Sequence, residues 1–271
     1  MKISVILSTY NNPRSLQQCL VGYGCQTWPD FELLIADDGS SDETRAVIAD
    51  FARQSPLRID HIWQEHRNFG KPRVVNEALR RAAGEYLLFS DGDCLPRRDF
   101  VAAHARHAQP NYFLAGGSHI HIPAAVHVEF RREDIEQQRV FAWQWLKSRG
   151  MANAAKYKYR LTANPRWAKL LNLLTPRAGS FIGCNASAWK SDILAVNGFD
   201  EDYATYGTED KDIGLRLTYH GVKSRRLKYS LVCLHLDHPR PYSQEEIAES
   251  FRRLRQTKAQ RTARAAHGLQ P

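Results

Sequence analysis

Two carboxylates separated by one residue follow an apolar run in the first half of the chain. The run Tyr86-Leu87-Leu88-Phe89-Ser90 has the length of a buried strand, and it ends in Asp91-Gly92-Asp93. Carboxylates at positions i and i+2 beyond a strand end can converge on one hard divalent cation when a glycine between them permits a turn. Such a cation neutralises the charge of a diphosphate ligand. The alternative interpretation is an ordinary Asp-Gly turn between a strand and a helix.

A second acidic group stands where a helix is predicted to begin. Three acids, Glu209, Asp210 and Asp212, occupy four positions, and the apolar residues Ile213, Leu215 and Leu217 follow them. Carboxylates are favourable at helix N-termini, so capping is one interpretation. The apolar residues would also hold Glu209 and Asp210 beside the core. A carboxylate fixed there can accept a proton from a substrate hydroxyl.

A histidine closes an apolar run in the C-terminal part of the chain. His235 follows the run 230–234, which is predicted to form a strand, and His238 lies three residues later. Taken alone, such a histidine is more often structural. With a cation implied upstream, a neutral imidazole could complete its coordination sphere. We take His235 as the first choice and keep His238 as the alternative.

Alternating strands and helices are predicted to position these groups. Strand-like segments at 2–9, 31–36, 59–63 and 86–90 are separated by helical segments that begin near Pro13, Ser41 or Asp42, and Pro72. This alternation is typical of right-handed βαβ units and a largely parallel sheet. Ligands of such sheets bind at the carboxyl ends of the strands. Polar residues cluster at three of these ends, which predicts a nucleotide site: Ser8-Thr9-Tyr10, Asp37-Asp38 and Asp91-Asp93.

The middle of the chain, 126–178, has a different pattern. It predicts two amphipathic helices that pack on the core, the second beginning at Asn164-Pro165 with Trp167, Leu170, Leu171 and Leu174 on one face. The alternative is an acceptor-binding or membrane-facing insertion, because basic residues flank the tryptophans. The basic end of the chain, 251–271, is either a solvated helix with a frayed end or a segment attracted to anionic lipid or phosphorylated glycan.

Composition narrows the class of protein. The formal charge of +9 favours an anionic partner such as a nucleotide, an anionic lipid surface or an acidic glycan, but no nucleic-acid recognition motif is present. The five cysteines are scattered without a Cys-x-x-Cys pair, which argues against a disulfide framework and a structural zinc site. With no signal peptide and no long apolar stretch, we expect a cytoplasmic protein, with peripheral attachment to the cytoplasmic face of the inner membrane as an alternative.

These motifs together resemble family 2 glycosyltransferases, whose fold is the GT-A type of α/β fold. In the first half the matching residues are 5–11, 31–40, 68–73 and Asp91-Gly92-Asp93. The C-terminal half is similar to the galactosyltransferase-type module of animal N-acetylgalactosaminyltransferases and bacterial chondroitin polymerases. There the matches are Gly183-Cys184-Asn185, Gly198-Phe199-Asp200-Glu201, Glu209-Asp210 and His235.

The resemblance implies an inverting transfer of a sugar from a nucleotide diphosphate donor, such as a UDP-sugar, to a glycan or glycolipid hydroxyl in bacterial surface polysaccharide or lipopolysaccharide synthesis. Asp93 and His235 would hold Mn²⁺ or Mg²⁺, Asp210 would be the general base, and Glu209 would bind the acceptor or the donor sugar. The donor site would comprise Thr9, Tyr10, Asp37 and Asp38 around the base, Arg73 near the base or the phosphates, and Asp91 with Gly92 near the ribose or sugar.

The resemblance also implies an organisation of the chain. Residues 1–240 would form one GT-A domain with a nucleotide-binding half (1–125), a helical insertion (126–178) and an acceptor half (179–240), followed by a basic tail (241–271). The related module often has Trp-Gly-Gly before the acidic pair, where this chain has Tyr206-Gly207-Thr208. A non-catalytic sugar-nucleotide-binding subunit is the alternative, although it would not need Asp210.

Overall fold

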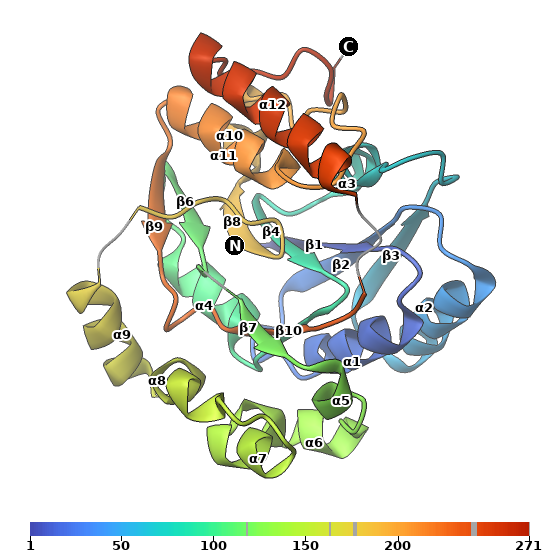
Figure 1. The fold of residues 1–271 in the computed structure, drawn as a ribbon, viewed down its shortest axis with the longest axis vertical. Coiled ribbons are helices and arrows are strands. Elements are labelled where there is room, and N and C mark those ends of the chain that lie inside the picture. Colours follow the sequence, from blue (N-terminus) through green and yellow to red (C-terminus); the bar gives the residue numbers. More distant parts are fainter. Residues whose placement is uncertain (118, 163, 176–177, 240–242, 271) are drawn as a thin grey trace.

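Seven strands form the central sheet of the computed structural model, which describes residues 1–117, 119–162, 164–175, 178–239 and 243–270 (Figure 1). The strand order is β3-β2-β1-β4-β8-β6-β9. Every neighbouring pair is parallel except those that β8 makes with β4 and β6. The predicted mostly parallel α/β fold is therefore confirmed. The strands are β1 (Ile3–Thr9), β2 (Phe31–Asp37), β3 (Arg58–Trp63), β4 (Tyr86–Asp91), β6 (Tyr112–Ala115), β8 (Asn185–Trp189) and β9 (Lys223–Arg226).

Helices cover both faces of this sheet because its strands carry apolar side chains on both sides. In β1, Val5 and Leu7 pack toward α1, α2 and α4, whereas Ile6 packs toward α3, α10 and α11. The predicted helix starts at Pro13, Ser41 and Pro72 are confirmed within one residue. The helices are α1 (Pro13–Gly24), α2 (Asp42–Gln54), α3 (Lys71–Arg81), α4 (Phe100–His107), α10 (Lys190–Ala195) and α11 (Glu209–Tyr219).

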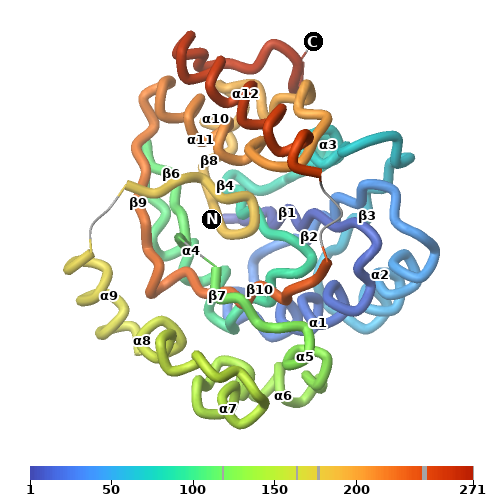
Figure 2. Tube along the Cα trace, in the orientation of Figure 1, coloured from blue at the N-terminus to red at the C-terminus, as the bar shows by residue number. Residues whose placement is uncertain are grey.

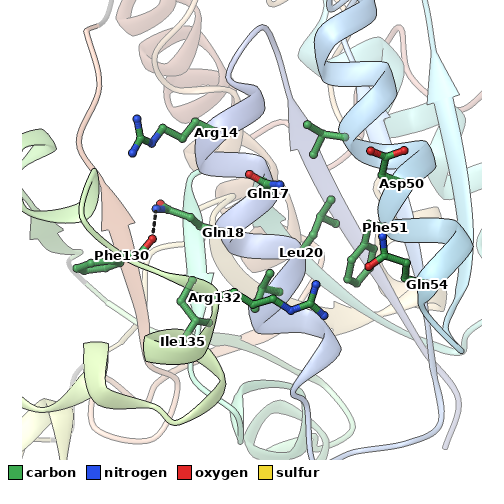
Figure 3. A pocket seen from close by; sticks show the side chains of 12 residues that line it. Arg14, Gln17, Gln18, Leu20, Asp50, Phe51, Gln54, Phe130, Arg132 and Ile135 are labelled. Atoms are coloured by element: carbon green, nitrogen blue, oxygen red, sulfur yellow. Dashed lines mark hydrogen bonds between the residues drawn. The ribbon is translucent and has the colours of Figure 1, made fainter.

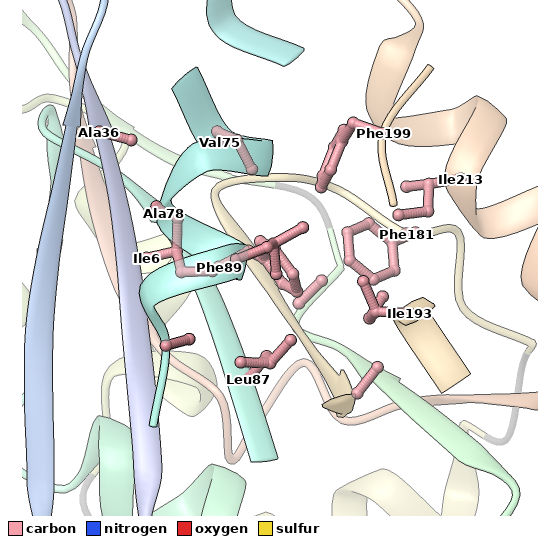
Figure 4. Close-up of a cluster of buried hydrophobic side chains, with 14 of the residues drawn as sticks. Ile6, Ala36, Val75, Ala78, Leu87, Phe89, Phe181, Ile193, Phe199 and Ile213 are labelled. Carbon is pink, nitrogen blue, oxygen red and sulfur yellow. The ribbon is translucent and has the colours of Figure 1, made fainter. Parts of the chain in front are cut away.

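Aromatic side chains join the two halves of the chain in the core below α3 and α11 (Figure 4). Phe89 of β4 lies with its ring centroid 5.4 Å from that of Phe181 and 5.6 Å from that of Phe199. All three side chains are buried. Burial of such rings contributes a few kcal/mol each, so the segments that carry the acids of both halves are held in fixed relative positions.

A second, three-stranded sheet holds the histidines. Its order is β5 (Cys94–Pro96), β10 (Cys233–Leu236) and β7 (Ile120–Ile122). The predicted strand at 230–234 is wrong in its position, because the backbone amides of Ser230 and Leu231 both donate to the Leu227 carbonyl in a turn. His235 consequently lies inside β10, opposite Cys94 and His121.

The middle segment is a chain of short helices, where the sequence predicted two longer ones. Its first part packs on the small sheet through Val126, Ile135 and Leu146, as predicted. The last helix does not, because Trp167 and Leu174 are 57% and 69% exposed. The elements are α5 (Ala124–His127), α6 (Arg132–Glu136), η1 (Arg139–Phe141), α7 (Trp143–Ser148), η2 (Ala154–Tyr157), α8 (Lys158–Leu161) and α9 (Pro165–Leu174).

The C-terminal helix α12 (Gln244–Gln260) packs along α11, as the trace in Figure 2 shows. The Thr257 hydroxyl donates to Asp212, and the Thr208 amide donates to the Ser250 hydroxyl. The predicted frayed end is wrong, since the backbone amide of Ala265 donates to the Val196 carbonyl. Among the helices that the structure describes, none combines the length and the apolar character needed to cross a bilayer.

Candidate active site

The ends of three neighbouring strands bring the predicted donor residues together. Parallel register places Thr9 of β1 opposite Asp37 of β2, and Ser8 opposite Asp91 of β4. The Asp38 amide donates to the Thr9 carbonyl, and the Gly92 amide donates to the Ser8 carbonyl. The polar clusters that the sequence predicted at strand ends therefore form one continuous edge of the sheet.

Asp37 is a fully buried residue that holds the turn after β2. Its carboxylate accepts hydrogen bonds from the Ser40 amide at 2.8 Å and from His61 Nε2 at 2.9 Å. Although burial opposes the charge, these hydrogen bonds lower the pKa of Asp37. The carboxylate is thus ionised, and its hydrogen bonds are made to other residues of the protein, which fits a role in shaping the donor pocket.

Asp38 is bound by the loop between β3 and α3, of which the sequence singled out only the part from residue 68 onward. Its carboxylate accepts from Gln64 Nε2 at 2.6 Å and from the Gly70 amide at 2.8 Å, and His66 Nδ1 lies 3.3 Å away. The His66 ring stacks on Tyr10 at 4.3 Å between centroids. Gln64 and His66 lie outside the strand-end pattern, and only their place between β3 and α3 could have suggested them.

Arg73 and Thr9 take different positions in this pocket. The exposed Arg73 side chain donates through Nε to Gln64 Oε1 at 2.9 Å, which places it on the Asp38 side of the site. Thr9 is buried, and its hydroxyl has no hydrogen-bond partner within the described parts of the chain. A Cβ atom at Gly92 would lie 3.0 Å from that hydroxyl, so glycine lets this turn pass close to β1.

Lys71 joins the donor edge to the acidic pair, and sequence reasoning missed it. Its Nζ donates to Asp91 Oδ1 at 2.8 Å and lies 3.9 Å from Glu209 Oε1. Burial opposes its charge, but Asp91 and Glu209 raise the pKa of Lys71 well above its usual value. A single lysine at a helix start carries no pattern of its own, so only its place in the run 68–73 could have drawn attention to it.

The acidic pair lies at the first turn of α11. Glu209 is buried, and desolvation, joined by the nearby Asp210, raises its pKa to about 7 despite the opposing effect of Lys71. Asp210 Oδ2 accepts from the Gly183 amide at 3.0 Å, and burial raises the pKa of Asp210 as well. Carboxyl groups with raised pKa values beside a site are suited to general base chemistry near neutral pH.

The third acid of the predicted group has a structural role. Asp212 is fully buried and bonded to the buried Arg216 Nε at 2.7 Å, and it also accepts from Thr257 of α12. The run Tyr206-Gly207-Thr208, which replaces the Trp-Gly-Gly of the related module, also has a structural role. The Thr208 hydroxyl donates to the Ser250 carbonyl at 2.8 Å. A glycine at 208 could not make that bond to α12.

Both candidate histidines converge on Asp93. Asp93 Oδ2 lies 2.8 Å from His238 Nε2 and 3.4 Å from His235 Nε2. Burial opposes the charge, but the two imidazoles hold the pKa of Asp93 below its usual value. One carboxylate and two imidazoles can hold a divalent metal ion such as Mn²⁺, and their ligand atoms all lie within 4.8 Å of one another. The residues therefore fit the implied cation.

Two neighbouring groups complete the surroundings of this cluster. His235 Nδ1 lies 3.3 Å from Asp237 Oδ1, which is also 2.6 Å from His121 Nδ1. A carboxylate beside the second nitrogen is the usual means of orienting a metal-binding imidazole. Cys94 lies beside Asp91 in another possible ligand group, but burial raises the pKa of its thiol, which disfavours the thiolate that a metal requires.

A separate cavity of about 530 Å³ is lined by residues of α1, α2 and α6 (Figure 3). Arg14, Gln18 and Phe51 are among the side chains that line it. None of the predicted site residues lines this cavity. The acid and histidine groups at the strand ends, rather than this cavity, therefore define the candidate site.

Comparison with known proteins identifies the family of the chain. The family model described as "Glycosyl transferase family 2" matches residues 4–175, and that described as "N-terminal domain of galactosyltransferase" matches 175–239. The chain is 28% identical over 261 residues to the uncharacterized glycosyltransferase YfnE of Bacillus subtilis (strain 168), covering 88% of this chain and 66% of the relative. The chain thus spans just under two thirds of that relative's length.

Two solved structures share the fold. The mannosyltransferase PcManGT from Pyrobaculum calidifontis, in complex with GDP-Man and Mn²⁺, superimposes with a TM-score of 0.65 at 21% identity, covering 97% of this chain and 65% of that one. S. aureus TarS 1–349 in complex with UDP-GlcNAc superimposes with a TM-score of 0.59 at 17% sequence identity, covering 94% of this chain and 65% of that one. The predicted GT-A fold is confirmed. The match over 4–175 shows that the chain belongs to glycosyl transferase family 2, with a galactosyltransferase-type module after it.

Proposed function

We propose that the chain transfers a hexose from a nucleotide-diphosphate sugar, a UDP-sugar, to a hydroxyl of a glycan or glycolipid acceptor, with inversion at the anomeric carbon. The acceptor belongs to bacterial surface polysaccharide or lipopolysaccharide synthesis. The neighbours PcManGT and TarS were solved with GDP-Man and UDP-GlcNAc, which supports a nucleotide-sugar donor. In this proposal 1–125 is the nucleotide-binding half and 179–240 the acceptor half.

The donor base lies over the Tyr10 and His66 stack, with Asp38 as the hydrogen-bond acceptor at the end of the pocket. Support comes from the 4.3 Å ring stacking and from the fixed Asp38 carboxylate. Arg73 and Asp37 shape the same side of the site. Asp91 with Gly92 faces the ribose and the sugar. The buried Thr9 hydroxyl has no hydrogen-bond partner among the described residues, so a hydrogen bond to the ligand would satisfy it.

Asp93, His235 and His238 would hold Mn²⁺ or Mg²⁺. When bound, the cation neutralises the negative charge that develops on the departing nucleotide diphosphate. Both histidines are proposed as ligands because each lies near Asp93 Oδ2, and Asp237 would orient His235. His235 is thereby kept with Nε2 directed at Asp93.

Asp210 removes the proton from the acceptor hydroxyl as that oxygen attacks the anomeric carbon. A single displacement needs one base and no covalent nucleophile, and it inverts the configuration. Asp210 suits this role because its bonds to the Gly183 and Lys211 amides orient it and leave further lone pairs unused. Glu209, held near Lys71 at 3.9 Å, positions the sugar or the acceptor.

The observation that carries the proposal is the position of Lys71. One ammonium group lies between Asp91 on the donor side and Glu209 beside the proposed base. A nucleotide-binding subunit without catalysis would need the donor acids, but it would not need them linked to a second acidic pair. The link fixes the donor sugar and the base relative to each other, and such positioning contributes a large part of catalysis.

We place the acceptor along the start of α11. A hollow of about 390 Å³ is lined by Phe181, Lys211 and Leu254, beginning one residue after Asp210. Arg255 and Lys258 of α12 also line it, which suits an acceptor that carries negative charge. Peripheral association with an anionic membrane is part of the same proposal.

Hydrolysis of a set of nucleotide sugars with Mn²⁺ tests the function. We expect one UDP-sugar to be consumed by the wild type, and Asp93→Ala to lose both this activity and metal-dependent nucleotide binding by at least about 100-fold. Asp50→Ala, an exposed acid on α2, is the matched control. If no nucleotide sugar is turned over although UDP binds, the chain is a binding subunit and the proposal is wrong.

A further inference from the structure

Helix α9 carries an apolar face that the rest of the described chain does not cover. Ala168 is its one buried residue, whereas Trp167, Leu170, Leu173 and Leu174 are all exposed. At 100° per residue these four fall on a single arc, on the side away from Ala168 and Asn172. A contiguous apolar patch of this kind is uncommon on a soluble surface and marks an interaction site.

The position of this face is fixed by the body of the protein. Asn172 donates to the Ser230 hydroxyl at 2.8 Å and accepts from the Tyr229 amide at 3.2 Å. Asn164 caps the helix by accepting from the amides of Arg166 and Trp167. In Figure 1, α9 lies at the periphery, at the lower left, and away from α12 at the top. The apolar arc therefore points outward because the polar side of the helix is anchored.

Charge identifies the kind of partner. Residues 137–191 contain ten lysines and arginines and no acid, and 213–236 contain five and no acid. The two segments are neighbours, since Arg160 Nε donates to the Lys228 carbonyl beside α9. Lys169 lies at the edge of the apolar arc, Arg166 lies within it at the first turn of the helix, and both are exposed. Tryptophan and leucine on one arc with flanking cations are typical of helices that lie in the interface of an anionic membrane.

A second copy of the chain suits this surface less well. A two-fold contact would place the same face against itself. Arg166 and Lys169 of both copies would then approach each other, and neither segment offers an acid to pair with them. Anionic lipid headgroups supply the missing charges, and acyl chains accept the leucines. At ten residues α9 is about 15 Å long, so it would lie in the interface and would not cross the bilayer.

We propose that α9 is a membrane-docking helix, which inserts Trp167, Leu170, Leu173 and Leu174 into a bilayer of anionic phospholipid while Arg166 and Lys169 contact the headgroups. This surface is remote from the Asp93 and Asp210 groups in sequence and needs no nucleotide sugar. The inference rests on the membrane association in the proposed function and names the surface that makes it. Its test needs no sugar transfer, so failure of vesicle binding can be told apart from failure of the proposed transfer.

Co-sedimentation of the full chain with vesicles tests the proposal. We expect binding to phosphatidylglycerol/phosphatidylethanolamine vesicles that falls steeply with salt, and little binding to pure phosphatidylcholine. The variant Leu170→Gln/Leu173→Gln/Leu174→Gln should bind the anionic vesicles at least about tenfold more weakly. The matched control is Leu194→Gln on α10, which is 46% exposed and should bind like the wild type.

Brominated lipid gives a second readout that does not depend on affinity. It should quench more tryptophan fluorescence in the wild type than in Trp167→Phe, because Trp167 would enter the acyl region. Circular dichroism checks that the exposed substitutions leave the fold unchanged. Equal vesicle binding by the triple variant would overturn the proposal. So would binding of a soluble anionic polysaccharide without vesicle binding, or a dimer of the wild type that the triple variant loses.

Discussion

The cluster around Lys71 and the surface of α9 use charge in opposite ways. Lys71 contacts Asp91 at 2.8 Å and Glu209 at 3.9 Å in a largely enclosed site. Lys169 of α9 is exposed, in a segment that contains no acid. Paired charge in a low dielectric fixes geometry, because separating the partners is costly. Exposed charge without acidic neighbours contributes little to folding and remains available to a partner. The first arrangement suits chemistry, and the second suits docking.

The largest expected effect comes from removing the charge of Lys71. In Lys71→Met the carboxylates of Asp91 and Glu209 lose their cation, so we expect a loss of about 3 kcal/mol in the free energy of unfolding, as for a broken buried pair. Sugar transfer should fall at least about 100-fold because the donor and the base lose their link. Urea denaturation and a transfer assay measure the two effects.

Lys169→Met is the matched control for stability, since its side chain is exposed, and it should change the free energy of unfolding by less than about 0.5 kcal/mol. Equal stability of the two variants would contradict the contrast between the regions.

The pH dependence of kcat/KM tests whether the acidic pair beside Lys71 is enclosed. Because desolvation raises the pKa of the proposed base Asp210, as it does that of Glu209, kcat/KM should fall about tenfold per pH unit on an acid limb that lies above the ordinary range of a carboxyl group. A pH–rate profile with saturating metal measures this limb. An acid limb near pH 4 would mean that the acidic pair is not desolvated.

Whereas activity should rise with pH, the contribution of Glu209 to the free energy of unfolding should fall as the pH rises. Its folded pKa is above the unfolded value of about 4.3, so the native state binds more protons between these values. The contribution of Glu209 to stability is thus complete below the unfolded pKa and is lost as the pH rises through 7. The free energy of unfolding of Glu209→Gln, measured by denaturation at several pH values, should lack this decrease with rising pH.

The smallest expected effect concerns α9. Leu173→Gln should change the free energy of unfolding by less than about 0.5 kcal/mol, because this leucine is exposed. Phe181→Ala in the aromatic core should lose about 3–5 kcal/mol. Thermal and chemical denaturation compare the two. A large loss from Leu173→Gln would show that its side chain packs against the protein.

The strand ends could be predicted from the sequence because their signals are local. An apolar strand followed at once by acids, as at Asp37-Asp38 and Asp91-Gly92-Asp93, places those acids at one edge of a parallel sheet. The acidic pair was predicted in the same way, from the apolar residues behind Glu209 and Asp210. In each case the acids are adjacent in sequence to the strand or helix that positions them, so a local pattern is enough to predict where they lie.

Other features depend on contacts between distant segments, which no local pattern records. Lys71 reaches Glu209 only because the core brings α3 beside α11. The packing of α9 was predicted wrongly because an amphipathic period does not say which face meets the protein. In α9 the polar Asn172 is hydrogen-bonded to Ser230, so the leucines on the opposite side of the helix face outward. His235 lies inside its strand because the chain turns at Leu227.

The measurement that tests the account most directly is donor binding and sugar transfer by Asp210→Asn, side by side. We expect UDP-sugar to bind with Mn²⁺ within about twofold of the wild type, since Asp210 accepts hydrogen bonds from Gly183 and Lys211, which are not among the proposed donor-binding residues. Transfer should fall by about 100-fold to 10,000-fold, because the amide cannot take the acceptor proton. Transfer at the wild-type rate would contradict the account, since Asp210 would then not be the base.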